Sequence, residues 1–154
     1  MSKNQKKIWI TGASSGIGKA LAEKFAEEGW KVAASARRKE ILDKMSEHEN
    51  IFSYPLDVTN QDQIKNSFEK IIEDFNGLNL CVFSSGTYDP KLEQEINVKQ
   101  NKFVMETNFF GVLYCIKAVE SYFKNKKDGH ISIVSSIAAY RGLPNSSGYG
   151  PSKA

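Results

Sequence analysis

The sequence contains little cysteine, no long hydrophobic run and no large excess of either charge. Two cysteines among 154 residues are too few for a disulfide scaffold. Cys81 and Cys115 both lie in apolar patterns, which indicates buried thiols in a reducing compartment. The longest apolar stretch, residues 109–116, is too short to cross a bilayer, and no secretory leader opens the chain. We therefore expect a cytoplasmic protein without a membrane anchor.

Metal ligands, internal repeats and a basic stripe are missing as well. His48 and His130 have no ligand-like neighbours in the sequence, so we expect no metal site. The formal net charge is only +3, and the lysine clusters are not interleaved with aromatic residues, which argues against a nucleic-acid partner. A composition of 40% hydrophobic and 25% charged residues is ordinary for a globular protein. The length suits a single domain over residues 1–154.

The most informative segment is a glycine-rich turn at residues 11–18, with the pattern T-G-x-x-x-G-x-G. It follows an apolar run at residues 8–10, which is typical of a buried parallel strand, and precedes a helical periodicity at residues 19–29. A second apolar strand at residues 32–35 completes a βαβ unit. This context favours a dinucleotide-binding turn over the alternative, a flexible loop between two elements.

Each glycine of the turn has an expected role. Gly12 permits the tight turn, Gly16 lets the backbone approach a pyrophosphate, and Gly18 lets the helix pack close to the strand. The beginning of the helix also offers unpaired N–H groups and the positive end of the helix dipole. We therefore expect this turn to hold the phosphates of a dinucleotide.

The rest of the chain continues to alternate strands with helices. Further strands are expected at residues 51–56, 78–84 and 131–135, and further helices at residues 37–47, 60–76 and 101–124. This alternation predicts an α/β fold, a Rossmann-like doubly wound parallel sheet with helices on both faces. A complete doubly wound sheet has two βαβαβ halves, and only five strands are visible here. We therefore expect the domain to be truncated early in the helix after strand five.

Two of these helices carry more detailed expectations. Thr59 stands where an N-cap is expected, and Gly77 stands where the same helix should end. The helix at residues 101–124 has apolar residues at helical spacing. They are expected on its inner side, and they are Phe103, Phe109, Val112, Ile116, Val119 and Phe123.

Tyr149 and Lys153 are four residues apart, so on a helix they share one face. A free tyrosine has a pKa of about 10, and an adjacent ammonium favours the phenolate. Such a pair could donate a proton to a carbonyl oxygen, or remove one from a hydroxyl, near neutral pH. The pair follows the fifth strand, and ligands of open α/β sheets bind at the carboxyl ends of the strands. The alternative is an exposed helix face without a chemical role.

Two parts of the chain together resemble the short-chain dehydrogenase/reductase family. One is the glycine turn with its unusual spacing, and the other joins residues 133–136 (I-V-S-S) to residues 149–154 (Y-G-P-S-K-A). The likeness covers essentially the whole chain. It implies a Rossmann domain that binds NAD(P) and an active site at the end of the fifth strand.

The resemblance also implies a role for each matching residue. Tyr149 would be the general acid/base, Ser136 would hydrogen-bond the substrate oxygen, and Lys153 would favour the tyrosinate and bind the nicotinamide ribose. Asn108 would hold a water molecule of the proton relay, unless it is an ordinary amide on a helix face. The residues that the resemblance assigns to the cofactor are Gly12, Ser14, Ser15, Gly16, Ile17, Gly18, Asp57, Val58, Gly86, Tyr149 and Lys153.

Asp57 and Val58 match the pair that binds adenine in the family, although an aspartate at a strand end is equally explained by turn chemistry. Gly86 would let the backbone pass close to the cofactor. The sequence departs from the family just before it, because residues 83–86 read F-S-S-G where the family has N-N-A-G. This change removes an asparagine whose hydrogen bonds steady the central sheet.

The choice between NAD and NADP depends on the residues that follow the second strand. An acidic residue there would accept the ribose hydroxyls of NAD, but the chain has Ala36, Arg37 and Arg38. Two guanidinium groups suit the 2′-phosphate of NADP, with forked, charge-assisted hydrogen bonds. The alternative is a pair of solvated arginines at the start of a helix. We expect NADP as the cofactor.

Together these features predict an NADP-dependent oxidoreductase that transfers hydride between nicotinamide and a small-molecule carbonyl or alcohol substrate, with a tyrosine as general acid/base. One alternative is a truncated nucleotide-binding module without turnover, because a helix that begins near Tyr149 would have too few residues to be stable by itself. Another is a scaffold that only dimerises. The resemblance also implies a homo-oligomer that forms through the helix at residues 101–124.

Overall fold

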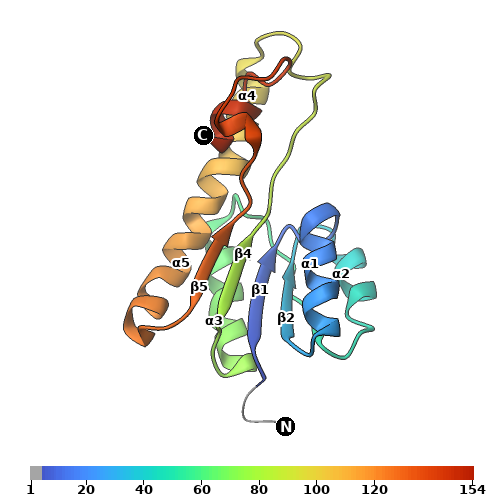
Figure 1. Cartoon of the computed structure of the whole chain (residues 1–154), viewed down its shortest axis with the longest axis vertical. Coiled ribbons are helices and arrows are strands. Elements are labelled where there is room, and N and C mark those ends of the chain that lie inside the picture. Colours follow the sequence, from blue (N-terminus) through green and yellow to red (C-terminus); the bar gives the residue numbers. More distant parts are fainter. Residues whose placement is uncertain (1–4) are drawn as a thin grey trace.

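A parallel sheet of five strands, in the order β3-β2-β1-β4-β5, forms the centre of the computed structural model, which describes residues 5–154 (Figure 1). The doubly wound fold predicted from the sequence is confirmed. The strand order reverses between β1 and β4, and an open α/β sheet has its binding crevice at such a switch point. The strands are β1 (Lys7–Thr11), β2 (Lys31–Ser35), β3 (Ile51–Ser53), β4 (Leu80–Phe83) and β5 (His130–Ile133).

Helices cover both faces of this sheet (Figure 1). Successive residues of a strand point to opposite faces, so Ile8 and Ile10 pack with α1 and α2, whereas Trp9 packs with α3 and α5. The C-terminal segment lies above the carboxyl ends of the strands, beside α4 (Figure 1). The helices are α1 (Gly16–Glu27), α2 (Lys39–Met45), α3 (Gln61–Phe75), α4 (Val98–Met105), the π-helical turn η1 (Glu106–Phe110), α5 (Gly111–Lys126), the 3₁₀ turn η2 (Ile137–Ala139) and α6 (Tyr149–Lys153).

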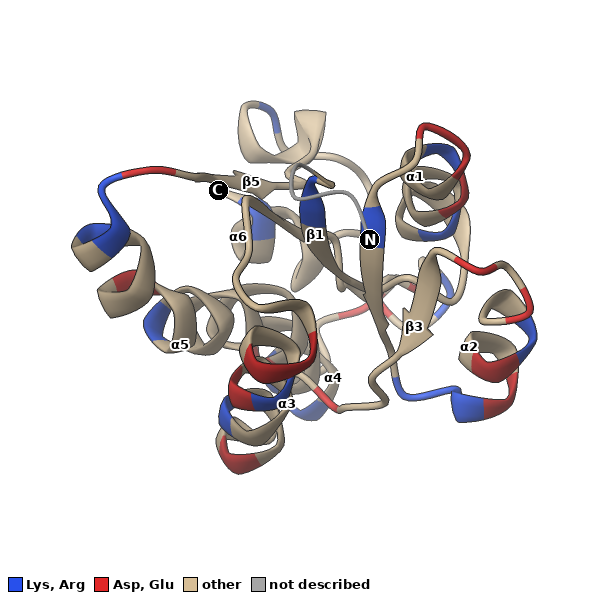
Figure 2. Ribbon diagram, turned by 90° about the horizontal axis from the view of Figure 1, so that it is seen from below, with Lys and Arg blue, Asp and Glu red and all other residues tan. Residues whose placement is uncertain are grey.

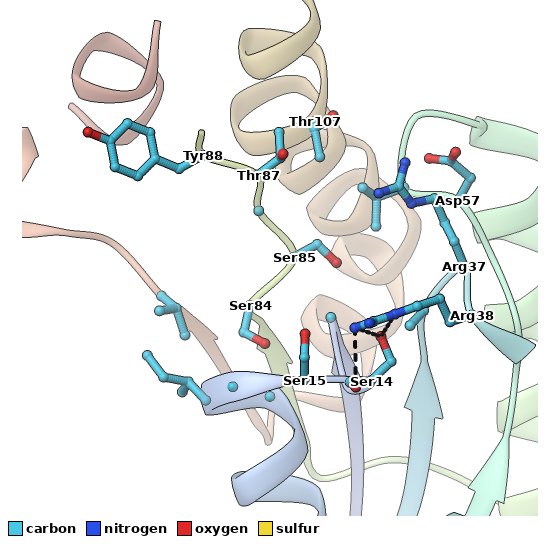
Figure 3. Close-up of a pocket in the computed structure, with 18 of the residues that line it drawn as sticks. Ser14, Ser15, Arg37, Arg38, Asp57, Ser84, Ser85, Thr87, Tyr88 and Thr107 are labelled. Carbon is cyan, nitrogen blue, oxygen red and sulfur yellow. Dashed lines mark hydrogen bonds between the residues drawn. The ribbon is translucent and has the colours of Figure 1, made fainter. Parts of the chain in front are cut away.

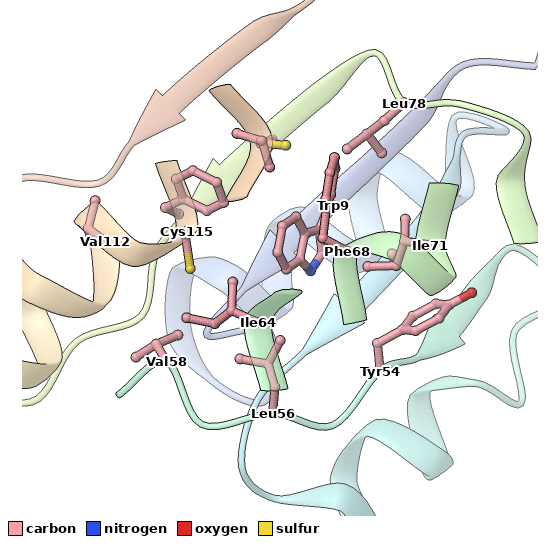
Figure 4. Packing of buried hydrophobic residues seen from close by; sticks show 14 of the residues in the cluster. Trp9, Tyr54, Leu56, Val58, Ile64, Phe68, Ile71, Leu78, Val112 and Cys115 are labelled. Carbon is pink, nitrogen blue, oxygen red and sulfur yellow. The ribbon is translucent and has the colours of Figure 1, made fainter. Parts of the chain in front are cut away.

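Trp9 is at the centre of the larger core cluster (Figure 4). Its side chain is fully buried, stacks on Phe68 at a ring-centroid distance of 5.9 Å, and meets Phe83 edge-on at 5.8 Å. The indole N–H would be costly to bury without a partner, and it donates to Ser35 Oγ at 2.9 Å. The tryptophan therefore links β1, β2, β4 and α3.

The two cysteines lie in the same cluster as free, buried thiols, as the sequence predicted. Cys81 on β4 has no exposed surface, and Cys115 on α5 is 1% exposed. Burial disfavours the charged thiolate, so it raises the pKa of Cys115 to about 12 and that of Cys81 well above its ordinary value.

The expected ends of α3 were wrong by one residue on each side. Asn60, not Thr59, is the N-cap, and its side chain accepts a hydrogen bond from the Gln63 N–H at 3.0 Å. The C-cap is Asn76 in the left-handed conformation at φ 50°, and Gly77 follows it. Asparagine is as good a cap as threonine and tolerates the left-handed region, so residue type alone could not separate these neighbours.

The helix expected at residues 101–124 is longer and interrupted. It comprises α4, η1 and α5 in succession, from Val98 to Lys126. Val112 and Val119 are buried as expected, but Phe103 and Phe109 are 44% and 39% exposed, so their assignment to the inner side was wrong. A π-helical turn inserts extra backbone into the helix, and a regular 3.6-residue period cannot be carried across it.

Charges of both signs are spread over the helices, whereas the strands carry few (Figure 2). Within residues 5–154, no helix combines the length and the apolar character that crossing a membrane requires. The same residues contain no cluster of three or more histidine, cysteine or acidic side chains that could hold a metal ion.

Substitution of Ser35 tests the polar contact inside the core. Ser35→Ala should lower the free energy of unfolding by about 1–3 kcal/mol, because it leaves the buried Trp9 N–H without an acceptor. Ser53→Ala is the matched control, since the Ser53 hydroxyl donates to Asp43 at the surface, and it should change stability by less than about 0.5 kcal/mol. Urea unfolding followed by tryptophan fluorescence measures both; equal losses would contradict the assignment.

Candidate active site

A cavity of about 430 Å³ opens at the carboxyl ends of the strands (Figure 3). Its wall is formed by the glycine turn, by the segments that follow β2, β3 and β4, and by α6. Every residue predicted to bind the cofactor lines it, although these residues come from distant parts of the chain. They are Gly12, Ser14, Ser15, Gly16, Ile17, Gly18, Arg37, Arg38, Asp57, Val58, Gly86, Tyr149 and Lys153.

The glycine turn passes unusually close to the loop after β4. Gly12 has a φ of +71°, and a Cβ placed there would lie 2.8 Å from the backbone of Ser84. A side chain on Gly18 would collide with the Gly12 carbonyl. The tight turn and the close helix packing expected of these two glycines are therefore both present. Ser84, at one of the positions where the family has asparagine, donates from Oγ to the Thr11 carbonyl at 2.7 Å and so still ties β4 to β1.

The two arginines after β2 have different surroundings. The Arg38 guanidinium donates to Ser14, to Oγ at 3.0 and 3.2 Å and to the carbonyl oxygen at 3.2 Å (Figure 3). It therefore braces the glycine turn. The Arg37 guanidinium lines the cavity and makes no hydrogen bond or ion pair with any part of the chain that the structure describes. Within residues 5–154, Arg37 therefore has all of its side-chain donors unused, whereas Arg38 uses Nε and Nη2.

Asp57 acts in a turn, as one of its two interpretations predicted. Its Oδ1 accepts hydrogen bonds from both the backbone N–H and the hydroxyl of Thr59 at 2.9 Å. The side chain of Val58 is buried, and a Cβ on Gly111 would lie 2.8 Å from Val58 Cγ2, so α5 packs closely at this point. Both residues nevertheless line the cavity.

Tyr149 and Lys153 share one face of α6, as their spacing predicted. The Lys153 Nζ lies 6.0 Å from the centroid of the Tyr149 ring and donates to the Val134 carbonyl at 3.1 Å. Burial of the ammonium lowers the pKa of Lys153 from its ordinary value. The phenol and a partly desolvated ammonium are therefore neighbours on the cavity wall.

Asn108 and Ser136 do not line the cavity. Asn108 lies in η1, is 3% exposed, and joins two segments of the site. Its Oδ1 accepts from the Thr87 N–H at 2.7 Å, and its Nδ2 donates to the Thr87 carbonyl at 2.9 Å and to Ser152 Oγ at 3.0 Å. Ser136 Oγ accepts from the Ala138 N–H at 3.2 Å and caps η2. Its neighbour Ser135 reaches the cavity instead.

Sequence reasoning missed several residues that line the cavity. Most of them follow a strand directly, so attention to every strand end would have found them. Thr107 gives no such signal, because η1 brings it into the cavity, where its buried hydroxyl has no partner among residues 5–154. The missed residues are Ala36, Leu56, Ser84, Ser85, Thr87, Tyr88, Thr107, Val134 and Ser135.

Sequence comparison with known proteins gives matches that agree on one family. Residues 6–154 fit the sequence profile described as short chain dehydrogenase. The dehydrogenase/reductase SDR family protein 7-like of Dictyostelium discoideum is 33% identical over an alignment that covers 99% of this chain and 52% of that protein. The 3-oxoacyl-(acyl-carrier-protein) reductase FabG of Thermotoga maritima is 33% identical, covering 94% of this chain and 61% of that protein.

Solved structures agree with the sequence comparison. The structure of ElxO with NADP bound matches this fold with a TM-score of 0.89 at 28% identity, covering 97% of this chain and 63% of that one. The chain thus spans between about half and two thirds of the length of the relatives it matches. The profile fits nearly the whole chain, and the sheet and the cavity have the expected form. The chain therefore belongs to the short-chain dehydrogenase/reductase family of oxidoreductases.

Proposed function

We propose that this chain forms the NADP(H)-binding and catalytic core of an enzyme that transfers hydride between nicotinamide and a small-molecule carbonyl or alcohol. One observation carries the proposal: Tyr149 and Lys153 line the same cavity as the glycine turn and Arg37. A proton donor, a cation and a phosphate-binding turn in one cavity are the protein groups that this reaction needs.

The glycine turn fits the pyrophosphate of a dinucleotide. Gly16 begins α1, and nothing lies within 4 Å of the place that a Cβ would take there. Phosphate oxygens can therefore approach the first N–H groups of α1, where the helix dipole favours a negative charge. Arg38 would keep the turn in place through its bonds to Ser14.

Tyr149 would exchange a proton with the substrate oxygen, and bound nicotinamide would supply or take up the hydride. The Lys153 ammonium lies 6.0 Å from the centroid of the Tyr149 ring, so a positive charge is close to the place of proton exchange. Ser136 would hydrogen-bond the same substrate oxygen. Within residues 5–154 its Oγ accepts from the Ala138 N–H and donates to no other group, so its hydroxyl proton is available to the substrate.

Asn108 would hold the water molecule of a proton relay, and its side chain has one hydrogen-bonding position left for that water. Both amide protons of its side chain are used, one by the Thr87 carbonyl and one by Ser152. Oδ1 accepts one hydrogen bond from Thr87, which leaves one lone pair for a water molecule. The water would therefore donate to Asn108 and accept from another group.

Arg37 is the group we assign to the 2′-phosphate of NADP. It lines the cavity after β2, has unused donors, and carries a charge that a phosphate would pair with bidentately. ElxO, a relative at 28% identity, was solved with NADP bound, which supports the same choice.

A nucleotide-binding module without turnover is the second candidate. The observation in its favour is that Asn108 and Ser136 lie outside the cavity wall and serve structural hydrogen bonds. NADPH oxidation in the presence of a ketone distinguishes the two candidates. A module without turnover would bind NADPH but would not oxidise it.

We also propose self-association through the helical segment from α4 to α5. Its surface exposes three apolar side chains that lie close together in the sequence, Phe109, Phe110 and Leu113, which are 39%, 40% and 42% exposed. Phe109 and Phe110 contact each other edge-on at 5.2 Å. Exposed aromatic groups of this kind are common at protein interfaces.

Replacement of Tyr149 tests the catalytic role. Tyr149→Phe should lower the rate of NADPH oxidation with small ketones about 10²- to 10⁴-fold, because the ring stays but the transferable proton is lost. The Kd for NADPH should change by less than about twofold. Tyr140→Phe is the control, since Tyr140 is 94% exposed. An unchanged rate for Tyr149→Phe would refute the role.

Replacement of Arg37 tests the cofactor preference. Arg37→Asp should raise the Kd for NADPH at least about tenfold, because a charge-assisted contact to phosphate is lost and a repulsive charge is added. The Kd for NADH should stay the same or fall. Lys44→Asp makes the same change of charge on the exposed side of α2 and should leave both values near those of the parent. Fluorescence titration measures them, and an equal response to both substitutions would argue against the assignment.

Replacement of Phe109 tests self-association. Phe109→Asp should weaken any dimer at least about tenfold, because it buries a charge in an apolar interface. Sedimentation velocity across a range of concentrations gives the dissociation constant. Ile96→Asp, on the loop before α4, is the control at a position that is 83% exposed. A parent chain that is monomeric throughout would contradict the proposal.

A further inference from the structure

The loop between β4 and α4, residues 84–97, contacts the segment that carries Tyr149 through two of its residues, Tyr88 and Glu93. It rises from the carboxyl end of β4 and lies beside the C-terminal segment at the top of the molecule (Figure 1). Tyr88 extends from the first part of the loop (Figure 3), and Glu93 lies five residues later. The sequence motifs include neither residue, and neither one exchanges a proton or binds substrate in the proposed reaction.

Glu93 holds the backbone at the start of α6. Its side chain is 2% exposed, and its Oε2 accepts hydrogen bonds from the N–H groups of Gly148 at 2.8 Å and Tyr149 at 2.9 Å. Its other oxygen, Oε1, is buried without a partner within residues 5–154. Burying a carboxyl group is expensive, so these two backbone bonds are the interactions that offset its burial.

Tyr88 holds the ring of Tyr149. The two rings stack with centroids 4.4 Å apart at an interplanar angle of 28°. The Tyr88 hydroxyl donates to the Asn145 carbonyl at 3.0 Å, which fixes Tyr88 to the loop before α6. Asn145 itself has a φ of +53°, so this hydrogen bond also secures a backbone conformation that few residues adopt.

Tyr149 begins α6, and the first backbone N–H groups of a helix have no partner within the helix and need an acceptor from elsewhere. Glu93 supplies that acceptor at this position. We propose that Tyr88 and Glu93 are positioning residues for Tyr149: Glu93 sets the place of its backbone, and Tyr88 sets the orientation of its ring. The inference rests on the proposed role of Tyr149 as the proton donor, and the two can be tested separately.

The direct test is fluorine NMR of the chain with 3-fluorotyrosine at position 149, recorded with NADPH present. A stacked, fixed ring should give a resonance displaced from that of the free amino acid. Glu93→Ala and Tyr88→Ala should move it toward the free value. Glu93→Gln retains an acceptor oxygen, and Tyr88→Phe retains the stacked ring but loses the hydrogen bond to Asn145. Both should therefore stay closer to the parent signal than the alanine variants do. Glu95→Ala and Tyr140→Ala, at exposed positions, are the controls.

Turnover gives the second readout. Glu93→Ala and Tyr88→Ala should lower kcat for reduction of small ketones about 10- to 100-fold, with the Kd for NADPH within about twofold of the parent. Glu93→Gln and Tyr88→Phe should restore most of the rate. A purely structural role would instead lower NADPH affinity and thermal stability together with kcat.

The outcomes separate the inference from the proposed function. If the alanine variants match the parent in both the fluorine signal and kcat, the positioning role is refuted. If they lose the fixed signal while Tyr149→Phe still reduces ketones at the parent rate, the positioning role stands and the proton-donor role fails. If the parent itself shows no turnover, the fluorine signal alone decides the positioning role.

Discussion

The close approach of the glycine turn to the loop after β4 is the constraint on which the rest of the structure depends. Gly12 lies so near the Ser84 backbone that no side chain would fit between them. This contact brings the end of β1 against the end of β4, at the point where the strand order reverses. The neighbouring strands are parallel and end at the same edge of the sheet. The segments that follow them and line the cavity therefore lie around this contact between β1 and β4.

The residues proposed for the reaction are held in place by contacts from other helices and loops. Helix α6, which carries Tyr149, is held by the loop after β4 through Glu93 and by η1 through Asn108. Asn108 has almost all of its hydrogen-bonding capacity in use, and it connects this loop to α6. The glycine turn is likewise braced by Arg38 from the end of β2. The arrangement of the residues in this site therefore depends on contacts between segments that are far apart in the sequence.

The sequence was sufficient to predict the sheet, most of its helices and many of the residues that line the cavity, because glycine spacing and apolar periodicity are local signals. It could not distinguish Asn60 from Thr59 as a cap, since both residue types suit that role. It also could not foresee η1, whose extra backbone turned Phe109 outward. Glu93 was missed because its partners are more than fifty residues away along the chain, where no periodicity connects them.

The two thiols of the core have a consequence for how the protein can be studied. Cys81 and Cys115 are buried on β4 and α5, and their raised pKa values leave almost no thiolate in the folded chain. Alkylating reagents attack the thiolate, so they can modify these cysteines only when strand and helix separate. The rate of alkylation would then report how often the core between the sheet and α5 becomes accessible to solvent.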